Sequence, residues 1–345
     1  MKKIVDVSGF GHSGKSAVSE FLADHEVFFS FPINVEFELF RVRGGLVDLY
    51  YSIYHNWNLI RSNESIHAFE KLVKRIGEIQ NYSRISTMWR SSGHGYNNFF
   101  GNSFISLSLE YINDIILFKQ DTFWPYARLY QSSFVLLLGK VKSKLFNKLS
   151  TQTVLYTNRN DFLIKTSNYV HKLFNNVCDN NASNIVLNNA FDPFNPSVCL
   201  NMVENSYSIV VDRDPRDIYA SLLNSAIGFI PEFEIENNFF ELKKMIVGSN
   251  DVDEFILRYK TIKGNVENIS HDRLLRIRYE DFVLNHEVSK TIIFSFLGIT
   301  NFNKKSKVFF NQDDSKLNIG IWKKYRDLPE IAKIEKELAE YCYQL

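Results

Sequence analysis

The pattern of hydrophobic and polar positions changes twice along this chain. Near the N-terminus, the apolar run Ile4–Val7 ends in a glycine-rich segment, and a helical pattern follows over Ser13–Leu22. A strand, a glycine loop and a helix in this order open a βα unit. From about residue 28 to residue 181 the pattern is mostly helical, and beyond it strands and helices alternate again.

The C-terminal part predicts a regular alternation of elements. Strands are expected over Asn184–Leu187, Tyr207–Val211 and Leu274–Tyr279. Helices are expected over Pro196–Val203, Pro215–Ser225, Asp251–Ile269, Ser289–Leu297 and Ile331–Tyr343, with Gly298 as a C-cap. Alternation at both ends of the chain predicts an α/β fold, a doubly wound parallel sheet.

The middle of the chain has few strand signals. Helical periodicity covers Ser65–Ile79, Phe104–Phe118, Ala127–Leu149 and Asp161–Val177. We interpret residues 28–181 as a long, mostly helical insertion within a single α/β domain that covers residues 1–345. It is expected to act as a lid or as an acceptor-binding region.

Composition narrows the class of protein. The 345 residues are 45% hydrophobic, which is enough for a substantial core, and the net charge of +1 argues against a nucleic-acid partner. The three cysteines are far apart, which predicts a reducing compartment, the cytoplasm, with neither a disulfide framework nor a metal cluster. The longest later apolar run, Phe134–Leu138, is too short for a membrane span.

The glycine-rich segment Gly9–Ser16 matches the pattern G-x-x-x-x-G-K-S. Glycines let the backbone form a nest of N–H groups, the following helix directs its positive end at the same point, and a lysine adds a full charge. The pattern therefore predicts a phosphate loop. The residues assigned to it are Gly11, His12, Ser13, Gly14, Lys15, Ser16 and Ala17.

A second anion site is predicted after the strand Tyr207–Val211. Arg213 stands at the strand end, where ligands of open α/β sheets collect, and Ser221 follows eight residues later on a helix. The guanidinium offers a planar fork that suits a phosphate. Three further charged residues are interpreted as an ordinary helix start, with Arg216 in solvent and with Asp214 and Asp217 complementing the dipole.

Here the sequence resembles the sulfotransferases that use 3′-phosphoadenosine-5′-phosphosulfate (PAPS). Their 3′-phosphate motif is a strand-end Arg, a turn often written R-D-P-R-D and a Ser eight positions after the first Arg, as in Arg213–Ser221. Leu274–Asp281 resembles their R-Y-E-D segment, and Lys316–Lys324 resembles their C-terminal K-x-x-x-G-x-W-K element. The matches follow the family's order and leave the middle of the chain uncovered.

The resemblance implies a function and a set of roles. The chain would transfer a sulfuryl group from PAPS to a hydroxyl or amine of a small-molecule or glycan acceptor, without a metal. Arg213 and Ser221 would hold the 3′-phosphate. The C-terminal element would close over the nucleotide, with Lys316 contacting the 3′-phosphate and with Trp322 and Lys323 ordering the loop. The alternative is a basic surface loop with one anchoring Trp.

Two departures from the family pattern concern catalysis. Relatives often carry Lys where His12 stands, whereas the basic residue here is Lys15, which is expected to act on the leaving phosphate. His12 would donate to the bridging oxygen if it is protonated. The alternative for His12 is a partly exposed loop residue. Relatives often use a His base in the stretch that matches Leu187–Pro193, which has none here. Asp192 is the nearest carboxylate for that role, or it forms an Asx turn before Pro193. Asn188 and Asn189 are expected to position the acceptor or the sulfonate.

The segment Glu36–Leu46 carries alternating charges and ends near a Gly-Gly pair. Glu36, Glu38, Arg41 or Arg43 could line the acceptor site, with Glu36 or Glu38 as a reserve base. The alternative is an amphipathic element with a solvated face.

Two other functions stay open. In a magnesium-dependent P-loop kinase or NTPase, Asp212 and Ser16 would hold the metal. In a non-catalytic nucleotide-binding interaction protein, the insertion would bind a partner. Neither the oligomeric state nor the acceptor is predicted.

Overall fold

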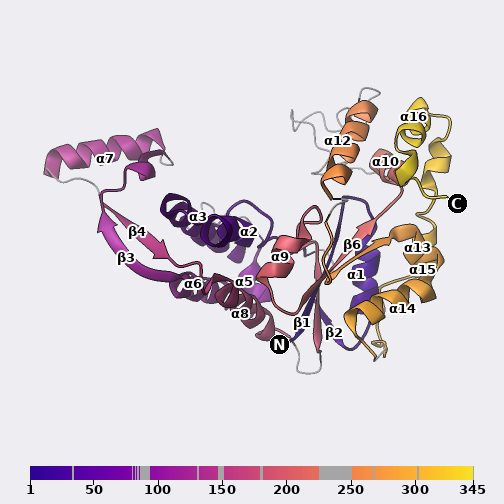
Figure 1. Ribbon diagram of the computed structural model, residues 1–345, viewed down its shortest axis with the longest axis horizontal. Coiled ribbons are helices and arrows are strands. Elements are labelled where there is room, and N and C mark those ends of the chain that lie inside the picture. The colour runs from indigo at the N-terminus through magenta and orange to yellow at the C-terminus, as the bar shows by residue number, and fades with distance from the viewer. Residues whose placement is uncertain are drawn as a thin grey trace. The chain divides into compact units, whose positions relative to one another are not determined.

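The structure is a computed structural model (Figure 1). It describes residues 1–345 except 33–34, 80, 82, 84, 86–93, 130–131, 147–150, 179–181, 225–250, 267–268, 301–302 and 345. The chain divides into two compact units. The first unit consists of Met1–Phe40 and Cys178–Leu345, and the second consists of Arg41–Val177.

The first unit is built on a five-stranded sheet with the order β2-β5-β1-β6-β7. All neighbouring strands pair in parallel, so the predicted α/β fold with a parallel sheet is confirmed. The strands are β1 (Lys3–Gly9), β2 (Phe28–Ser30), β5 (Asn184–Asn188), β6 (Ser206–Asp212) and β7 (Leu274–Arg278).

Both faces of the central strands are covered. Successive residues of a strand point to opposite faces, and both Ile4 and Val5 of β1 are completely buried. The same holds for Ile185 and Val186 of β5, of which at most 2% is exposed. Strands buried on both faces are typical of parallel sheets packed between helices, and this explains why they read as continuous apolar runs.

The predicted helices of the first unit begin and end within three residues of the observed ones, except that the helix predicted over Ile331–Tyr343 ends at Glu337. α14 ends at Gly298, whose φ of 62° is the left-handed geometry that the C-cap prediction requires. The helices are α1 (Lys15–Ala23), α9 (Pro196–Met202), α10 (Pro215–Asn224), α12 (Asp251–Val266), α13 (Tyr279–Leu284), α14 (His286–Leu297), α15 (Gln312–Lys316) and α16 (Pro329–Glu337).

Two apolar clusters support the elements that carry the site. One joins β1 and β6 to α1, α13 and α14, and Phe21 of α1 contacts the rings of Phe282 and Phe294. The other joins α10, α12 and α16 through residues such as Tyr219 and Phe255. These clusters therefore fix both the strand ends and the C-terminal segment within the first unit.

The second unit is mostly helical, but it also contains a two-stranded antiparallel sheet. The predicted helix Phe104–Phe118 ends at Ile115, and strand β3 (Ile116–Thr122) begins at the next residue. It pairs with β4 (Gln152–Thr157), a contact between distant segments that local periodicity does not reveal. The other elements are α2 (Leu46–Leu49), the π-helix η1 (Tyr50–His55), α3 (Leu59–Gly77), α5 (Tyr96–Phe99), α6 (Phe104–Ile115), η2 (Pro125–Leu129), α7 (Ser133–Phe146) and α8 (Phe162–Asn175).

The core of the second unit is aromatic. The rings of Tyr111 on α6 and Tyr169 on α8 stack at 4.5 Å, and their hydroxyls bond to Thr166 and Ser108. The buried phenol hydroxyls are out of reach of water, and these hydrogen bonds give them partners inside the protein. Trp124 and Trp57, two of the aromatic residues that could stack on a sugar, are described, whereas Trp89 lies outside the described residues.

The three cysteines are free and buried. Among the described residues, no helix is both long and apolar enough to cross a bilayer.

Candidate functional site

The predicted phosphate loop lies between β1 and α1. Gly14 is the N-cap of α1 with a φ of 85°, and no side chain caps the helix. The first turn of α1 contains no acidic residue, and the side chain of Lys15 is only 14% exposed. The positive helix end is thus left to an external anion.

The hydroxyl of Ser13 gives independent support for a ligand at this loop. Its hydroxyl is completely buried and has no hydrogen-bond partner among the described residues. A buried polar atom without a partner costs free energy unless a ligand or water completes it. In contrast, Ser16 is exposed, and the N–H of Ala17 donates to the Gly14 carbonyl within the first turn.

Gly14 also packs directly on the ring of Tyr279. A Cβ at Gly14 would lie 2.2 Å from Cδ2 of Tyr279. We expect Gly14→Ala to lower the free energy of unfolding by about 3 kcal/mol, because left-handed backbone strain and overpacking add together. Gly101→Ala is the matched control, since Gly101 has a φ of 58° but nothing within 4 Å of its Cβ position. In denaturant unfolding, Gly101→Ala should lower the free energy of unfolding by only about 1 kcal/mol. Equal decreases in Gly14→Ala and Gly101→Ala would refute the packing contribution.

Arg213 connects the phosphate loop to the C-terminal segment. Its Nη1 donates to the His12 carbonyl at 2.8 Å and to the Ser221 hydroxyl at 3.2 Å. Its Nη2 donates to the carbonyl of Asn318, and the guanidinium lies 5.2 Å from the ring centroid of Tyr279. The acceptors of these hydrogen bonds are all uncharged, and its Nε is buried without a partner among the described residues.

This buried cation suits a phosphate. Only 5% of Arg213 is exposed, and the predicted partner Ser221 lies beside it. A buried guanidinium bonded to neutral oxygens gains more from an anion than from water. The structure therefore brings the predicted loop and the predicted strand-end site together.

The C-terminal element is held onto α10 by Asp217. The carboxylate of Asp217 accepts from the backbone N–H of Gly320 at 2.7 Å and of Trp322 at 3.1 Å. Burial raises the pKa of Asp217, while both amide bonds and Arg213 lower it. Asp217 thus does more than complement the helix dipole, because it fixes the loop that carries Asn318.

The prediction that Arg216 is solvated is wrong. Only 5% of Arg216 is exposed, its fork bonds the carboxylates of Asp214 and Glu335, and it lies 4.2 Å from the Trp322 ring centroid. The C-terminal helix α16 and the Trp322 loop cover it, which no pattern near Arg216 could indicate. The ring of Trp322 thus packs against a buried guanidinium, and its contribution to nucleotide binding stays a prediction.

Lys316 and Lys323 are both exposed. Lys316 pairs with Asp313 at 2.9 Å, and its side chain is 44% exposed. The amine of Lys323 lies 6.0 Å from the Trp322 ring centroid, and its N–H donates to Gly320. Their contacts to a nucleotide stay predictions.

The R-Y-E-D segment forms hydrogen bonds with the segments that carry the site. The hydroxyl of Tyr279 donates to the Ser315 carbonyl, and Glu280 accepts from the backbone N–H of Asp214. Asp281 accepts from the hydroxyl of Tyr343 at 2.6 Å. These contacts are structural, in line with the interpretation of that strand and helix start.

Glu36 lies beside Lys15 although 21 positions separate them in the chain. One carboxylate oxygen of Glu36 is 3.7 Å from the Lys15 amine, and the other accepts from Nδ2 of Asn189 at 2.8 Å. The Glu36 side chain is 37% exposed, so the carboxylate is reachable. Glu36 also forms a parallel bridge with Asn188, which places both asparagines next to the loop.

Asp6 was missed by the sequence analysis. It is completely buried in β1 and accepts from the backbone N–H groups of Ala190 and Phe191 and from the hydroxyl of Ser8. These bonds hold the turn after β5, in which Asn189 has a φ of 53°. An acidic residue inside an apolar strand was the available signal, because a buried carboxylate requires donors.

Asp192 forms the Asx turn that was the alternative to a catalytic role. Its Oδ1 accepts from the backbone N–H of Phe194 at 3.0 Å, and its carbonyl accepts from Asn195. Arg41 is the first residue of the second unit, so its assignment to the acceptor site stays a prediction.

His12 has a left-handed backbone with a φ of 60°. Burial lowers the pKa of its imidazole from the ordinary 6.5, and the positive charges of Arg213 and Lys15 lower it further. Burial and both cations therefore favour the neutral form of the imidazole.

We expect this shift to make stability depend on pH. Because the folded pKa of His12 is depressed, the unfolded chain binds more protons, and the stabilisation present above about pH 6.5 is lost as the pH falls through the folded pKa. The free energy of unfolding, measured with denaturant, should fall from pH 8 to pH 5 in the wild type and should fall less in His12→Asn, which lacks the titrating group. Asn is chosen because it tolerates the left-handed backbone. Equal losses in both proteins would contradict the shift.

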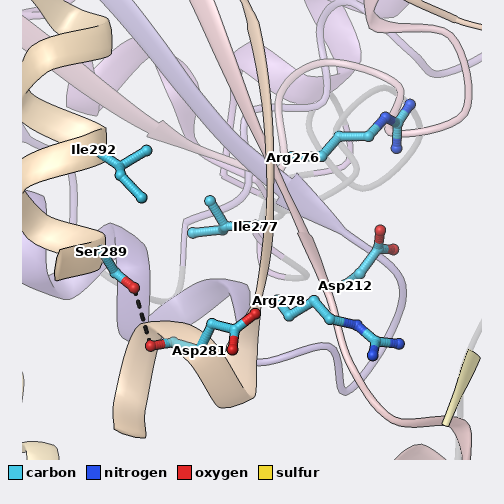
Figure 2. Close-up of a pocket in the computed structure, with 7 residues that line it drawn as sticks. All are labelled: Asp212, Arg276, Ile277, Arg278, Asp281, Ser289 and Ile292. Atoms are coloured by element: carbon cyan, nitrogen blue, oxygen red, sulfur yellow. Dashed lines mark hydrogen bonds between the residues drawn. The ribbon is translucent and has the colours of Figure 1, made fainter. Parts of the chain in front are cut away.

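Asp212, the proposed magnesium ligand of the NTPase interpretation, has another partner. Its Oδ1 accepts from the amine of Lys263 at 2.7 Å, and that amine lies 5.3 Å from the Phe10 ring centroid. Figure 2 shows Asp212 near Arg276 and Arg278, in a pocket of about 250 Å³ along β7. No residue of the phosphate loop lines this pocket. The structure holds no group of His, Cys, Asp and Glu that could bind a metal among its described residues.

No protein-family model and no curated protein matches the chain. Solved structures do show similarity. The sulfotransferase domain from the curacin biosynthetic pathway is 14% identical with a TM-score of 0.42, over 100% of this chain and 98% of that one. The sulfotransferase domain of the Synechococcus PCC 7002 olefin synthase is 13% identical with a TM-score of 0.39, over 99% and 94%. Retinol dehydratase, solved with androsterone and the inactive cofactor PAP, is 13% identical with a TM-score of 0.32, over 98% and 80%.

Proposed function

We propose that this protein is a sulfotransferase that binds PAPS at the loop Gly9–Ser16 and at Arg213. The observation that carries the proposal is the position of Arg213, whose guanidinium bonds the phosphate loop, Ser221 and the C-terminal segment at once. Three motifs that are far apart in the sequence thus meet at one guanidinium, which supports an anion site there.

The chain offers separate groups for the two phosphate positions. When bound, the donor supplies a sulfuryl group on its 5′-phosphate. Lys15 and the free N–H groups at the start of α1 would stabilise negative charge that develops on that phosphate. Arg213 and Ser221 would bind the 3′-phosphate. Neutral His12 would contribute its backbone and, in one tautomer, an N–H donor.

Glu36 is the best supported base for the acceptor. A hydroxyl that attacks sulfur loses its proton, and a carboxylate beside the reacting centre can accept it. Glu36 lies 3.7 Å from Lys15, and Asn189 orients it through a hydrogen bond. Asp192 is less suited, because its carboxylate closes an Asx turn. Asn188 and Asn189 would position the acceptor, which we propose to be a hydroxyl or amine of a small molecule or glycan in the cytoplasm.

The magnesium-dependent NTPase is less well supported. Asp212 would have to leave Lys263, and a buried lysine amine would then lack its 2.7 Å partner. The hydrogen bonds of Asp217 with the backbone of Gly320 and Trp322 would also have no role in a generic NTPase. The non-catalytic alternative would be excluded by turnover with any acceptor.

Ligand-dependent thermal unfolding tests the proposal. Adenosine 3′,5′-bisphosphate at about one hundred times its dissociation constant should stabilise the protein by about 2.7 kcal/mol, which raises the midpoint by a few degrees. The shift should persist in EDTA. Stabilisation only by ADP with magnesium would overturn the sulfotransferase proposal and return Asp212 and Ser16 to a metal site.

A further inference from the structure

The connection between β3 and β4 is unusually long for a hairpin. It spans residues 123–151, whereas two antiparallel strands are normally joined by about 2–5 residues. Long connections in compact units are most often functional. This one contains helix α7, which Figure 1 shows at the far end of the hairpin, apart from α3, α6 and α8.

One face of α7 is apolar and exposed. Phe134, Leu137, Leu138, Val141 and Leu145 follow the i, i+3, i+4, i+7 spacing of a single helical stripe. Their exposed fractions are 68%, 57%, 52%, 48% and 74%. A stripe of this kind normally packs on a core, and here it faces outward.

The charges around the stripe all have the same sign. At 100° per residue, Lys140 and Lys144 lie on one side of the stripe and Lys142 on the other. The whole connection 123–151 contains five basic residues (Arg128, Lys140, Lys142, Lys144 and Lys148) and no acidic one. The net charge of the full chain is +1, so the remainder carries 1 − 5 = −4.

We propose that α7 docks flat on an anionic lipid surface. Lysines on both sides of an apolar stripe can extend their amines to lipid headgroups while the stripe enters the acyl boundary. The 14 residues of α7 are about 21 Å long, which is too short to cross a hydrocarbon core of about 30 Å. Cytoplasmic leaflets carry anionic lipids, which attract such clusters.

A second copy of the chain fits this surface less well. Two copies that met through the stripe would bring their lysine rows together, and like charges repel at such distances. The proposal concerns the second unit alone and does not depend on the proposed sulfotransferase activity.

Vesicle co-sedimentation of the full chain tests the proposal. The probes are vesicles of phosphatidylcholine alone and of phosphatidylcholine with phosphatidylglycerol. The wild type should sediment with the anionic vesicles, and binding should weaken as salt rises. Exchange of Lys140, Lys142 and Lys144 for Gln should weaken partitioning by about a hundredfold. Leu145→Asp should weaken it at least about tenfold.

Matched variants separate docking from general surface effects. Ile164 on α8 is 64% exposed, so Ile164→Asp should leave vesicle binding and the unfolding midpoint unchanged. Equal binding to neutral and anionic vesicles, or unchanged binding by the Lys triple variant, would overturn the proposal. A dimer in light scattering that Leu145→Asp dissociates, without vesicle binding, would assign the face to a second copy instead.

Discussion

Replacement of Arg213 by alanine is expected to weaken binding of adenosine 3′,5′-bisphosphate by about a hundredfold or more. The guanidinium is buried and is the charged donor at the predicted 3′-phosphate position, where each charge-assisted bond contributes about 1.5–3 kcal/mol. Isothermal titration gives the affinity directly. Arg213→Lys should recover part of the affinity, because it keeps the charge but loses the planar fork.

Arg273 provides the control for loss of a structural guanidinium. It donates to the carbonyls of Leu200, Val203 and Ser206, which is the same chemistry as that of Arg213. Both alanine variants should unfold at a lower temperature than the wild type. Only Arg213→Ala should also lose the shift caused by the bisphosphate. Full retention of the shift in Arg213→Ala would remove this residue from the binding site.

Glu36→Gln is expected to lower kcat by about 10²–10⁴ while bisphosphate binding stays close to that of the wild type. The amide keeps the size of the side chain and can bond Asn189, but it cannot accept the acceptor's proton. A steady-state assay of sulfuryl transfer measures kcat, and titration with the bisphosphate measures binding. A merely structural role would affect both measurements together.

Two further carboxylates make this test selective. Glu38→Gln changes a neighbouring acidic residue and should keep activity within about tenfold. Asp192→Asn removes the competing base but leaves an oxygen for the Asx turn with Phe194. A larger loss of kcat in Asp192→Asn than in Glu36→Gln would return the role of base to Asp192.

Much of the first unit was predictable from local patterns. The strand patterns predicted β1, β5, β6 and β7 to within a residue or two. For the central strands the signal was the apolar run, because strands buried on both faces are mostly apolar. The hairpin β3–β4 was not predicted, since Leu117 and Phe118 are more than half exposed and their strand is defined by its partner. Local periodicity describes one element at a time and carries little information about pairing.

The two halves of the candidate site differ in the same way. Gly14, Lys15, Arg213 and Ser221 were identified because each is specified by spacing within one turn or one strand and helix. Asn318 beside Arg213 and Asp6 beneath the β5 turn were not identified. Their roles depend on contacts across more than one hundred positions of the chain.

The sequence by itself determined a parallel α/β sheet and predicted a phosphate loop and a strand-end arginine site, because hydrophobic period, glycine content and short spacings are local properties. The tertiary structure alone decided that Glu36 lies next to Lys15, that Arg216 is buried and that Asp212 pairs with Lys263. These contacts follow from the strand order and from how the C-terminal segment packs on α10. The strand order brings distant carboxyl ends to one edge of the sheet, and a linear pattern does not encode which side chains meet there.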